Sequence, residues 1–258
     1  MSNTPHQKPE KAATNANAFR TLVLDSYLSQ SNGIHRPLDD ADYRQFARAY
    51  AYHLRGWVPS PKPAAGAWLD LACGQGALML LARQLGFSRV EGVDVSDEML
   101  ASARARGLLA HAGDVATFLA ATPSAQWDVI SLFDILEHFP RDEAHQVLTQ
   151  VRRALVPGGI CLIKVPNLAS PLGPSVQASD LTHETSFSPP SLECLSKLAG
   201  FRGCELREVG PAPTSAIAQA RAVLWRGLRL TYALANAIET GSPGDGIYTR
   251  IMLAKLQA

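Results

Sequence analysis

The stretch AWLDLACGQGALMLLARQLG, residues 67–86, decides the fold. Its first six residues predict a short buried strand, Cys73 to Gly76 predict a sharp turn, and the remainder predicts a helix. A buried strand that turns directly into a helix is typical of a βαβ unit in a parallel sheet. Ligands bind beyond the carboxyl ends of such strands, so the turn is the first candidate site.

The same alternation of short apolar runs and helical patterns continues along the chain. Ser96, followed by two acidic residues, can cap one helix, and Ser188 with Pro189 begins another. The pattern predicts an α/β fold with a doubly wound, Rossmann-like, mostly parallel seven-stranded sheet. The predicted strands cover residues 67–72, 89–95, 108–114, 127–133 and 159–166, with two more near 203–209 and 247–256.

The chain divides into three parts. Residues 1–18 are polar and predict a mobile tail, and residues 19–63 predict a helical segment and a proline-rich linker. Residues 64–258 form the α/β domain, in which 168–190 is a long loop suited to a lid. Residues 212–244 predict a helical insertion between the last two strands.

Composition excludes several classes of function. The 258 residues are 47% apolar and 18% charged, which is a globular profile. A net charge of +1 lacks the basic footprint of nucleic-acid binding, so we expect no nucleic-acid partner. Four dispersed cysteines and no run long enough to span a membrane predict a cytoplasmic protein. We expect no metal, because Asp180, His183 and Glu184 on one loop are typical of solvated groups.

Asp94, at the end of the second predicted strand, suits a carboxylate that accepts hydrogen bonds from ribose hydroxyls. A dinucleotide site would have a third glycine where this chain has Met79. Asp70 places negative charge beside the turn, which suits an amino group or a sulfonium better than a pyrophosphate. These residues favour S-adenosylmethionine (SAM) over NAD.

Five segments together resemble the class I SAM-dependent methyltransferases of the methyltransferase-domain 11/23 type, in the order and spacing of that family. The resemblance covers about residues 66–167, and HETSFSPPSLECLSKLAGF (183–201) is similar to the family's segment before its sixth strand. The five segments are LDLACGQGALM (69–79), EGVDVSDEML (91–100), AGDVATF (112–118), WDVISLFDILEHF (127–139) and VRRALVPGGICLIKVPN (151–167).

The resemblance implies SAM as cofactor and gives its binding residues. Asp70 and Gly74 would lie by the methionine moiety, Gly76 would permit close approach, and Asp94 would bind the ribose. Met99 would pack on the adenine. The full set that the resemblance implies is Asp70, Ala72, Gly74, Gly76, Asp94, Val95, Met99, Gly113, Asp114, Val115 and Phe133.

A base is needed only if the methyl acceptor must lose a proton, as a hydroxyl does, and histidine suits that role near neutral pH. The candidates for catalysis are His138 and the pair His183 and Glu184, which follow the fourth and fifth predicted strands. The alternative for His138 is a packing residue at the start of a helix. The alternative for His183 is a hydrogen bond within its loop.

The sequence specifies the methyl acceptor less well than the cofactor. By analogy with enzymes of polysaccharide synthesis, we expect O-methylation of a sugar hydroxyl on a glycan or glycoconjugate. The alternatives are a quinone or other small metabolite, and a SAM- or nucleotide-binding protein without turnover. The predicted helix at 214–240 carries Arg221, Trp225 and Arg229 on one stripe. It either packs on the domain with a solvated basic edge, or docks on a membrane surface, a partner subunit or an anionic polymer.

Overall fold

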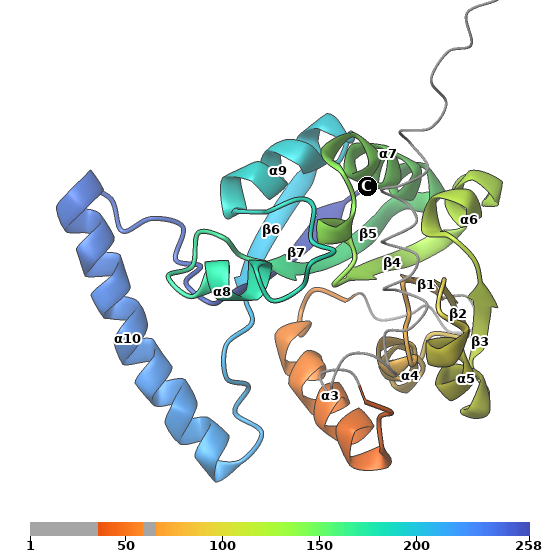
Figure 1. Ribbon diagram of the computed structural model, residues 1–258, viewed down its shortest axis with the longest axis horizontal. Helices are drawn as coiled ribbons and strands as arrows, with labels where there is room; N and C mark the ends of the chain where they lie inside the picture. The colour runs from red at the N-terminus through yellow and green to blue at the C-terminus, as the bar shows by residue number, and fades with distance from the viewer. Residues whose placement is uncertain (1–35, 59–65) are drawn as a thin grey trace, which may run out of the picture.

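The computed structural model describes residues 36–58 and 66–258, and Figure 1 shows how their elements are arranged. The predicted tail at 1–18 and the junction between residues 63 and 64 lie outside the described residues.

A seven-stranded sheet forms the centre, in the order β3-β2-β1-β4-β5-β7-β6. All neighbours pair in parallel except β7, which is antiparallel to both β5 and β6. The predicted mostly parallel, doubly wound sheet is therefore confirmed. The strands are β1 (Ala67–Leu71), β2 (Arg89–Asp94), β3 (Leu109–Ala112), β4 (Trp127–Phe133), β5 (Leu155–Pro166), β6 (Gly203–Glu208) and β7 (Ile251–Gln257).

Helices cover both faces of the sheet, and most begin where the sequence offers a cap. Asp39 and Asp42 form a capping box, and Ser96 and Asp114 accept hydrogen bonds from the first turns of their helices. The helices are α3 (Asp40–His53), α4 (Ala77–Gln84), α5 (Asp97–Ala105), α6 (Val115–Ala121), α7 (Arg141–Ala154), α8 (Gly173–Gln177), α9 (Pro189–Leu198) and α10 (Ala216–Thr240), with the 3-10 turn η1 (Leu136–His138).

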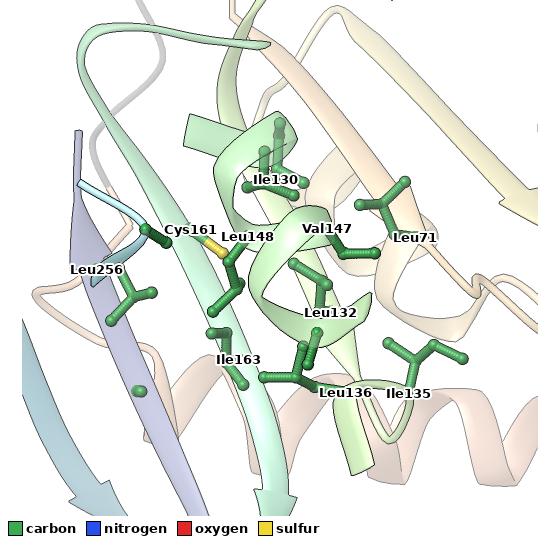
Figure 2. Packing of buried hydrophobic residues seen from close by; sticks show 14 of the residues in the cluster. Leu71, Ile130, Leu132, Ile135, Leu136, Val147, Leu148, Cys161, Ile163 and Leu256 are labelled. Carbon is green, nitrogen blue, oxygen red and sulfur yellow. The ribbon is translucent and has the colours of Figure 1, made fainter. Parts of the chain in front are cut away.

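The core lies in two layers, one on each face of the sheet. In the layer seen in Figure 2, Val147 and Leu148 of α7 meet Leu132 of β4 and Ile163 of β5. The other layer holds α3, α4 and α5 against the opposite face. Central strands buried on both sides explain why β1, β4 and β5 are apolar runs rather than alternating ones.

The last strand is shorter than predicted, because it begins at Ile251 rather than near Ile247. Asn167 is fully buried, and its Nδ2 donates hydrogen bonds to the carbonyls of Ile247 and Thr249. The backbone before β7 therefore holds the 167–170 turn instead of pairing in the sheet. Ser170 adds a third link by donating to the carbonyl of Tyr248.

Met79 is fully buried at the place where a dinucleotide-binding loop would have its third glycine. The close approach of helix and strand is provided instead by Gly92 on β2. A Cβ added to Gly92 would lie 2.6 Å from Met79 Sδ and 2.7 Å from Cys73 Cβ. At this crossing the small residue is on the strand, and Met79 on the helix fills the space beside Gly92.

Gly92→Ala should therefore lower the free energy of unfolding by about 1–3 kcal/mol, because the new methyl group overpacks this crossing. Urea denaturation followed by circular dichroism measures the change. Gly203→Ala is the matched control, since its added Cβ, also on a strand, meets nothing nearer than 4.0 Å. Equal stabilities of the two variants would contradict this packing account.

Helix α10 lies along one side of the molecule in Figure 1, and none of its residues is buried. Trp225 and Arg229 face the body, where Arg229 Nε lies 2.9 Å from Glu208 Oε2. Arg221 and Arg226 are exposed, so the expected basic stripe is only partly solvated. The opposite face is apolar and 42–78% exposed, which the sequence analysis did not anticipate. It comprises Ile217, Val223, Leu224, Leu228, Leu230, Leu234 and Ile238.

No helix in the described part of the chain is long and apolar enough to cross a membrane.

Candidate functional site

A cavity of about 250 Å³ lies at the carboxyl ends of β1, β2 and β4. The chain runs outward from β1 through β2 to β3 and then returns to the other side as β4, which makes this the topological switch point of the sheet. Its lining residues are Ala72, Gly74, Asp94, Val95, Ser96, Met99, Asp114, Val115, Phe133, Asp134, Ile135, His138 and Phe139.

Asp94 fixes the turn that follows β1. Its Oδ2 accepts a hydrogen bond of 2.8 Å from the backbone N–H of Gly74, and its Oδ1 accepts one of 2.9 Å from Ser96. Burial raises the pKa of Asp94, and these N–H donors oppose the shift by stabilising the carboxylate. Each oxygen has capacity for a further hydrogen bond, so the group can also receive ligand hydroxyls.

The cavity combines this carboxylate with apolar walls. Val95, Met99, Val115 and Phe139 contribute apolar surface. Asp114, a second acid in the lining, caps α6 by accepting from the N–H of Thr117 at 2.9 Å. A site that binds a nucleoside offers apolar surface to its flat base and hydrogen-bond acceptors to its ribose hydroxyls. The residues present therefore fit the adenosyl part of SAM.

Eight of the eleven predicted cofactor residues line the cavity, and Asp70, Gly76 and Gly113 do not. Asp70 is buried beneath the turn, where it accepts a hydrogen bond of 2.5 Å from Ser131 Oγ. Burial raises the pKa of Asp70 to about 7, so its carboxyl is partly neutral at physiological pH. The contact of Asp70 with the methionine moiety stays a prediction.

Gly76 serves packing rather than a ligand's approach. Its φ is +81°, and an added Cβ would lie 2.3 Å from Leu108 Cδ1 and 3.1 Å from Ala103 Cβ. The absent side chain therefore lets α5 and the start of β3 close against the turn. Gly113 donates its N–H to the carbonyl of Asp94 at 2.9 Å, which holds the ends of β3 and β2 together.

The N-terminal helix α3 is fastened to the glycine turn through Tyr43. The Tyr43 hydroxyl donates to the carbonyl of Gln75 at 2.8 Å. The Gln75 side chain in turn accepts from the N–H of Leu38 and donates to the carbonyl of Arg36. Tyr43 does not line the cavity, and these hydrogen bonds let α3 support the glycine turn.

Beyond β4, a half-buried lysine lies beside the site. Lys164 of β5 forms an ion pair with Asp134, which has a φ of +53° and lines the cavity. Asp134 and the nearby Tyr50 keep the pKa of Lys164 above its usual value despite the burial. The charge of Asp134 is therefore balanced from within the protein.

His138 lines the cavity, and His183 stands behind it with ring centroids 4.8 Å apart. Thr182 Oγ1 donates its only hydrogen to Asp180 Oδ1 at 2.6 Å, so it accepts from Nδ1–H of His138 at 2.8 Å. The lone pair of His138 is then on Nε2. His183 Nδ1 lies 3.1 Å from the carbonyl of Gln177 and must donate to it, which leaves its own lone pair on Nε2.

Glu137 was not singled out from the sequence, although it is 1% exposed and its Oε1 lies 4.0 Å from His183 Nε2. Burial raises the pKa of Glu137, and the charge of Asp134 adds to the effect. The available signal was a carboxylate within the apolar run ILEHF. Glu184 is exposed, and only its backbone is engaged, through an N–H donated to the carbonyl of Glu137 at 2.9 Å. The structure thus places Glu137, rather than Glu184, beside His183.

Comparison with known proteins identifies this architecture. A family model described as a methyltransferase domain matches residues 42–206. This chain is 36% identical to a trans-aconitate 2-methyltransferase of Variovorax paradoxus over 110 residues, which are 42% of its length. Over 106 residues, 38% of the chain, it is 30% identical to a ubiquinone biosynthesis O-methyltransferase of Psychrobacter arcticus. The aligned parts span 41% and 40% of those relatives, well under two thirds of their length.

Solved structures show the same fold. A SAM-dependent methyltransferase from Archaeoglobus fulgidus superposes with a TM-score of 0.61 at 17% identity, covering 83% of this chain and 94% of that one. A Haemonchus contortus phosphoethanolamine N-methyltransferase, solved with SAM, gives 0.57 at 16% identity and covers 96% of this chain and 58% of its own. With the family model matching well over half of its length, the chain belongs to the class I SAM-dependent methyltransferase family.

Proposed function

We propose that this protein transfers the methyl group of SAM to a hydroxyl oxygen. The observation that carries the proposal is the position of His138, which lines the same cavity as Asp94 and Gly74. Bound SAM supplies an electrophilic methyl group: the acceptor oxygen bonds to the methyl carbon, and the electron pair of the broken C–S bond stays on sulfur. A hydroxyl must lose its proton in this reaction, and a histidine in the cavity wall suits that need.

In this proposal the chain holds the cofactor through the walls already described. Asp94 accepts the ribose hydroxyls, while Val95, Met99 and Val115 enclose the adenine. Nε2 of His138 takes the acceptor proton, because Thr182 holds Nδ1 in the protonated form. Asp180 fixes Thr182 in turn, through hydrogen bonds to both its hydroxyl and its N–H.

For the acceptor we propose a sugar hydroxyl on a lipid-linked glycan, with a quinone or other small metabolite as the second candidate. A relative named for ubiquinone biosynthesis supports the second candidate. Both a lipid-linked glycan and a quinone reside at a membrane, so a chain that reaches the bilayer surface would suit either. The apolar face of α10 supports such contact.

The face of α10 that points away from the body has the features of a helix that lies on an anionic bilayer surface. Its apolar side chains form one stripe, and helical periodicity places the exposed Arg221 and Arg226 at the two borders of that stripe. Arginines bordering an apolar face complement lipid phosphates, so we propose that this face of α10 binds a lipid surface.

The double variant Leu224→Glu/Leu234→Glu should lose binding to phosphatidylglycerol vesicles, at least tenfold in the partition coefficient, because each charge would enter the acyl boundary. Vesicle sedimentation measures it. Leu198→Glu is the control, since Leu198 is a 69% exposed leucine on α9 and should leave binding unchanged. Unchanged sedimentation of the double variant, or a dimer that buries α10, would overturn the lipid surface.

The acceptor itself is tested with labelled SAM. The full chain is incubated with lipid-linked glycans, with quinone precursors and with RNA in separate reactions. The proposal expects label in the glycan fraction, removed by conditions that cleave glycosidic linkages. Label in quinones alone would replace the proposed acceptor with the second candidate, and label in RNA alone would overturn both.

A further inference from the structure

Glu137, His138 and His183 bring three metal-ligand side chains together beside the cavity. One ligand atom from each lies within 4.8 Å of the others. The first two belong to η1 after β4, and His183 comes from the loop that precedes α9. Two N–H groups of that loop, from Glu184 and Thr185, donate to the carbonyl of Glu137 at 2.9 and 3.0 Å. The two segments are therefore fixed to one another by the backbone.

The Nδ1 hydrogen bonds of both imidazoles match those of metal-binding histidines. A metal-bound histidine usually donates its other ring N–H to a carbonyl, a carboxylate or a comparable acceptor, which fixes its tautomer. His183 does so through Gln177, and His138 does so through Thr182 and Asp180. In each ring the lone pair is on Nε2, and Nε2 of His183 is directed at Glu137.

Glu137 supplies the second, independent indication of a ligand. Its side chain is 2% exposed, and its Oε2 is buried with no hydrogen-bond partner among residues 36–58 and 66–258. Its other oxygen lies 4.0 Å from His183 Nε2, too far for a hydrogen bond. A buried carboxylate oxygen without a partner is costly, and a bound cation would remove that cost.

We propose that Glu137, His138 and His183 bind one divalent transition-metal ion at the wall of the methyl-transfer cavity. Two imidazoles and one carboxylate favour Zn²⁺, Mn²⁺ or Co²⁺ over Mg²⁺ and Ca²⁺, which prefer all-oxygen sites. Ligand atoms about 2.0–2.2 Å from such an ion stand about 3–4 Å apart, so the three side chains need to move inward only slightly. The metal-free expectation of the sequence analysis is revised by this proposal.

The role of the ion rests on the proposed function. His138 lines the cavity, so an ion on its Nε2 would have open coordination positions toward the acceptor. A hydroxyl bound there loses its proton to water more readily, and the resulting oxygen attacks the methyl carbon while the C–S electron pair stays on sulfur. With the ion in place His138 is a ligand; without it, the same nitrogen takes the proton itself.

Metal binding is tested on the full chain without cofactor or acceptor. The protein is stripped with EDTA, dialysed, and titrated with Zn²⁺ by calorimetry and with Co²⁺ by visible absorption. We expect one ion per chain and a Co²⁺ spectrum of a nitrogen- and oxygen-ligated site. His183→Ala and Glu137→Gln should weaken binding by at least tenfold, whereas His145→Ala, on the exposed side of α7, should not.

Thermal unfolding shows whether a variant that fails to bind is folded. Zn²⁺ should raise the melting temperature of the wild type and of His145→Ala but not of His183→Ala, which should still unfold cooperatively. Stoichiometric binding that persists in His183→Ala and Glu137→Gln, or no binding in the wild type, would overturn the site. Metal binding without methyl transfer would contradict only the proposed function. Methyl transfer that EDTA does not affect, in a chain that binds no ion, would contradict only the metal site.

Discussion

Replacing His138 with alanine should lower the turnover number by about 10²–10⁴-fold, because the acceptor hydroxyl loses the group that assists its deprotonation. The cofactor dissociation constant should change by less than about twofold, since the adenosyl walls are formed by other residues. Turnover is measured by release of S-adenosylhomocysteine with the acceptor found by labelling, and cofactor affinity by calorimetry.

His145→Ala is the matched control for that experiment. His145 lies on α7, where its Nε2 is 3.3 Å from the carbonyl of Leu198. It is not one of the residues that line the cavity. It should keep wild-type turnover. Wild-type turnover in His138→Ala would remove this residue from the reaction, and an equal loss in both variants would point to damage of the fold instead.

Asp94→Ala should weaken SAM binding by about 1–3 kcal/mol, equivalent to about 5–150-fold, because ribose hydroxyls would be left without their acceptor. The same change removes the hydrogen bonds to Gly74 and Ser96, which loosens the turn. Asp94→Asn retains an acceptor oxygen and should lose less. Calorimetric titration with SAM measures all three proteins.

Asp97→Ala serves as the control for that series. Asp97 lies three residues further on, at the start of α5, where its side chain is 84% exposed and outside the cavity. It should bind SAM like the wild type. If Asp94→Ala also binds like the wild type, then the carboxylate does not contact the cofactor.

The sheet and the cofactor side were predictable because their causes are local in sequence. A buried strand, a glycine turn and a helix follow directly on one another at 67–86, and Asp94 ends the next strand. Helix caps such as Asp39 and Ser96 act within three residues. Such signals need no knowledge of distant segments, so the fold and most of the cavity lining could be predicted.

Contacts between distant segments could not be predicted from the sequence. Gly76 was expected to make room for a ligand, but the neighbour that needs the room is Leu108. Asp70 was expected to face the ligand, but Ser131 on β4 binds it beneath the turn. In each case the partner lies over 30 residues away in the sequence, and only the folded chain shows which side of the residue is occupied.

The acceptor side could be predicted least. His183 was found as a candidate, but its partnership with Glu137 depends on how the loop after β5 folds back over η1. The orientation of α10 could not be found from its charges either. Trp225 and Arg229 face the body because Glu208 attracts them, and this leaves the apolar stripe on the outside.

The central claim is that the cavity at the ends of β1, β2 and β4 binds an adenosyl sulfonium, and calorimetry of the full chain with SAM and with NAD tests it most directly. The account predicts one SAM per chain, displaced by S-adenosylhomocysteine and weakened by Asp94→Ala, with no heat from NAD. Binding of NAD in competition with SAM, or no SAM binding at millimolar concentration, would contradict it.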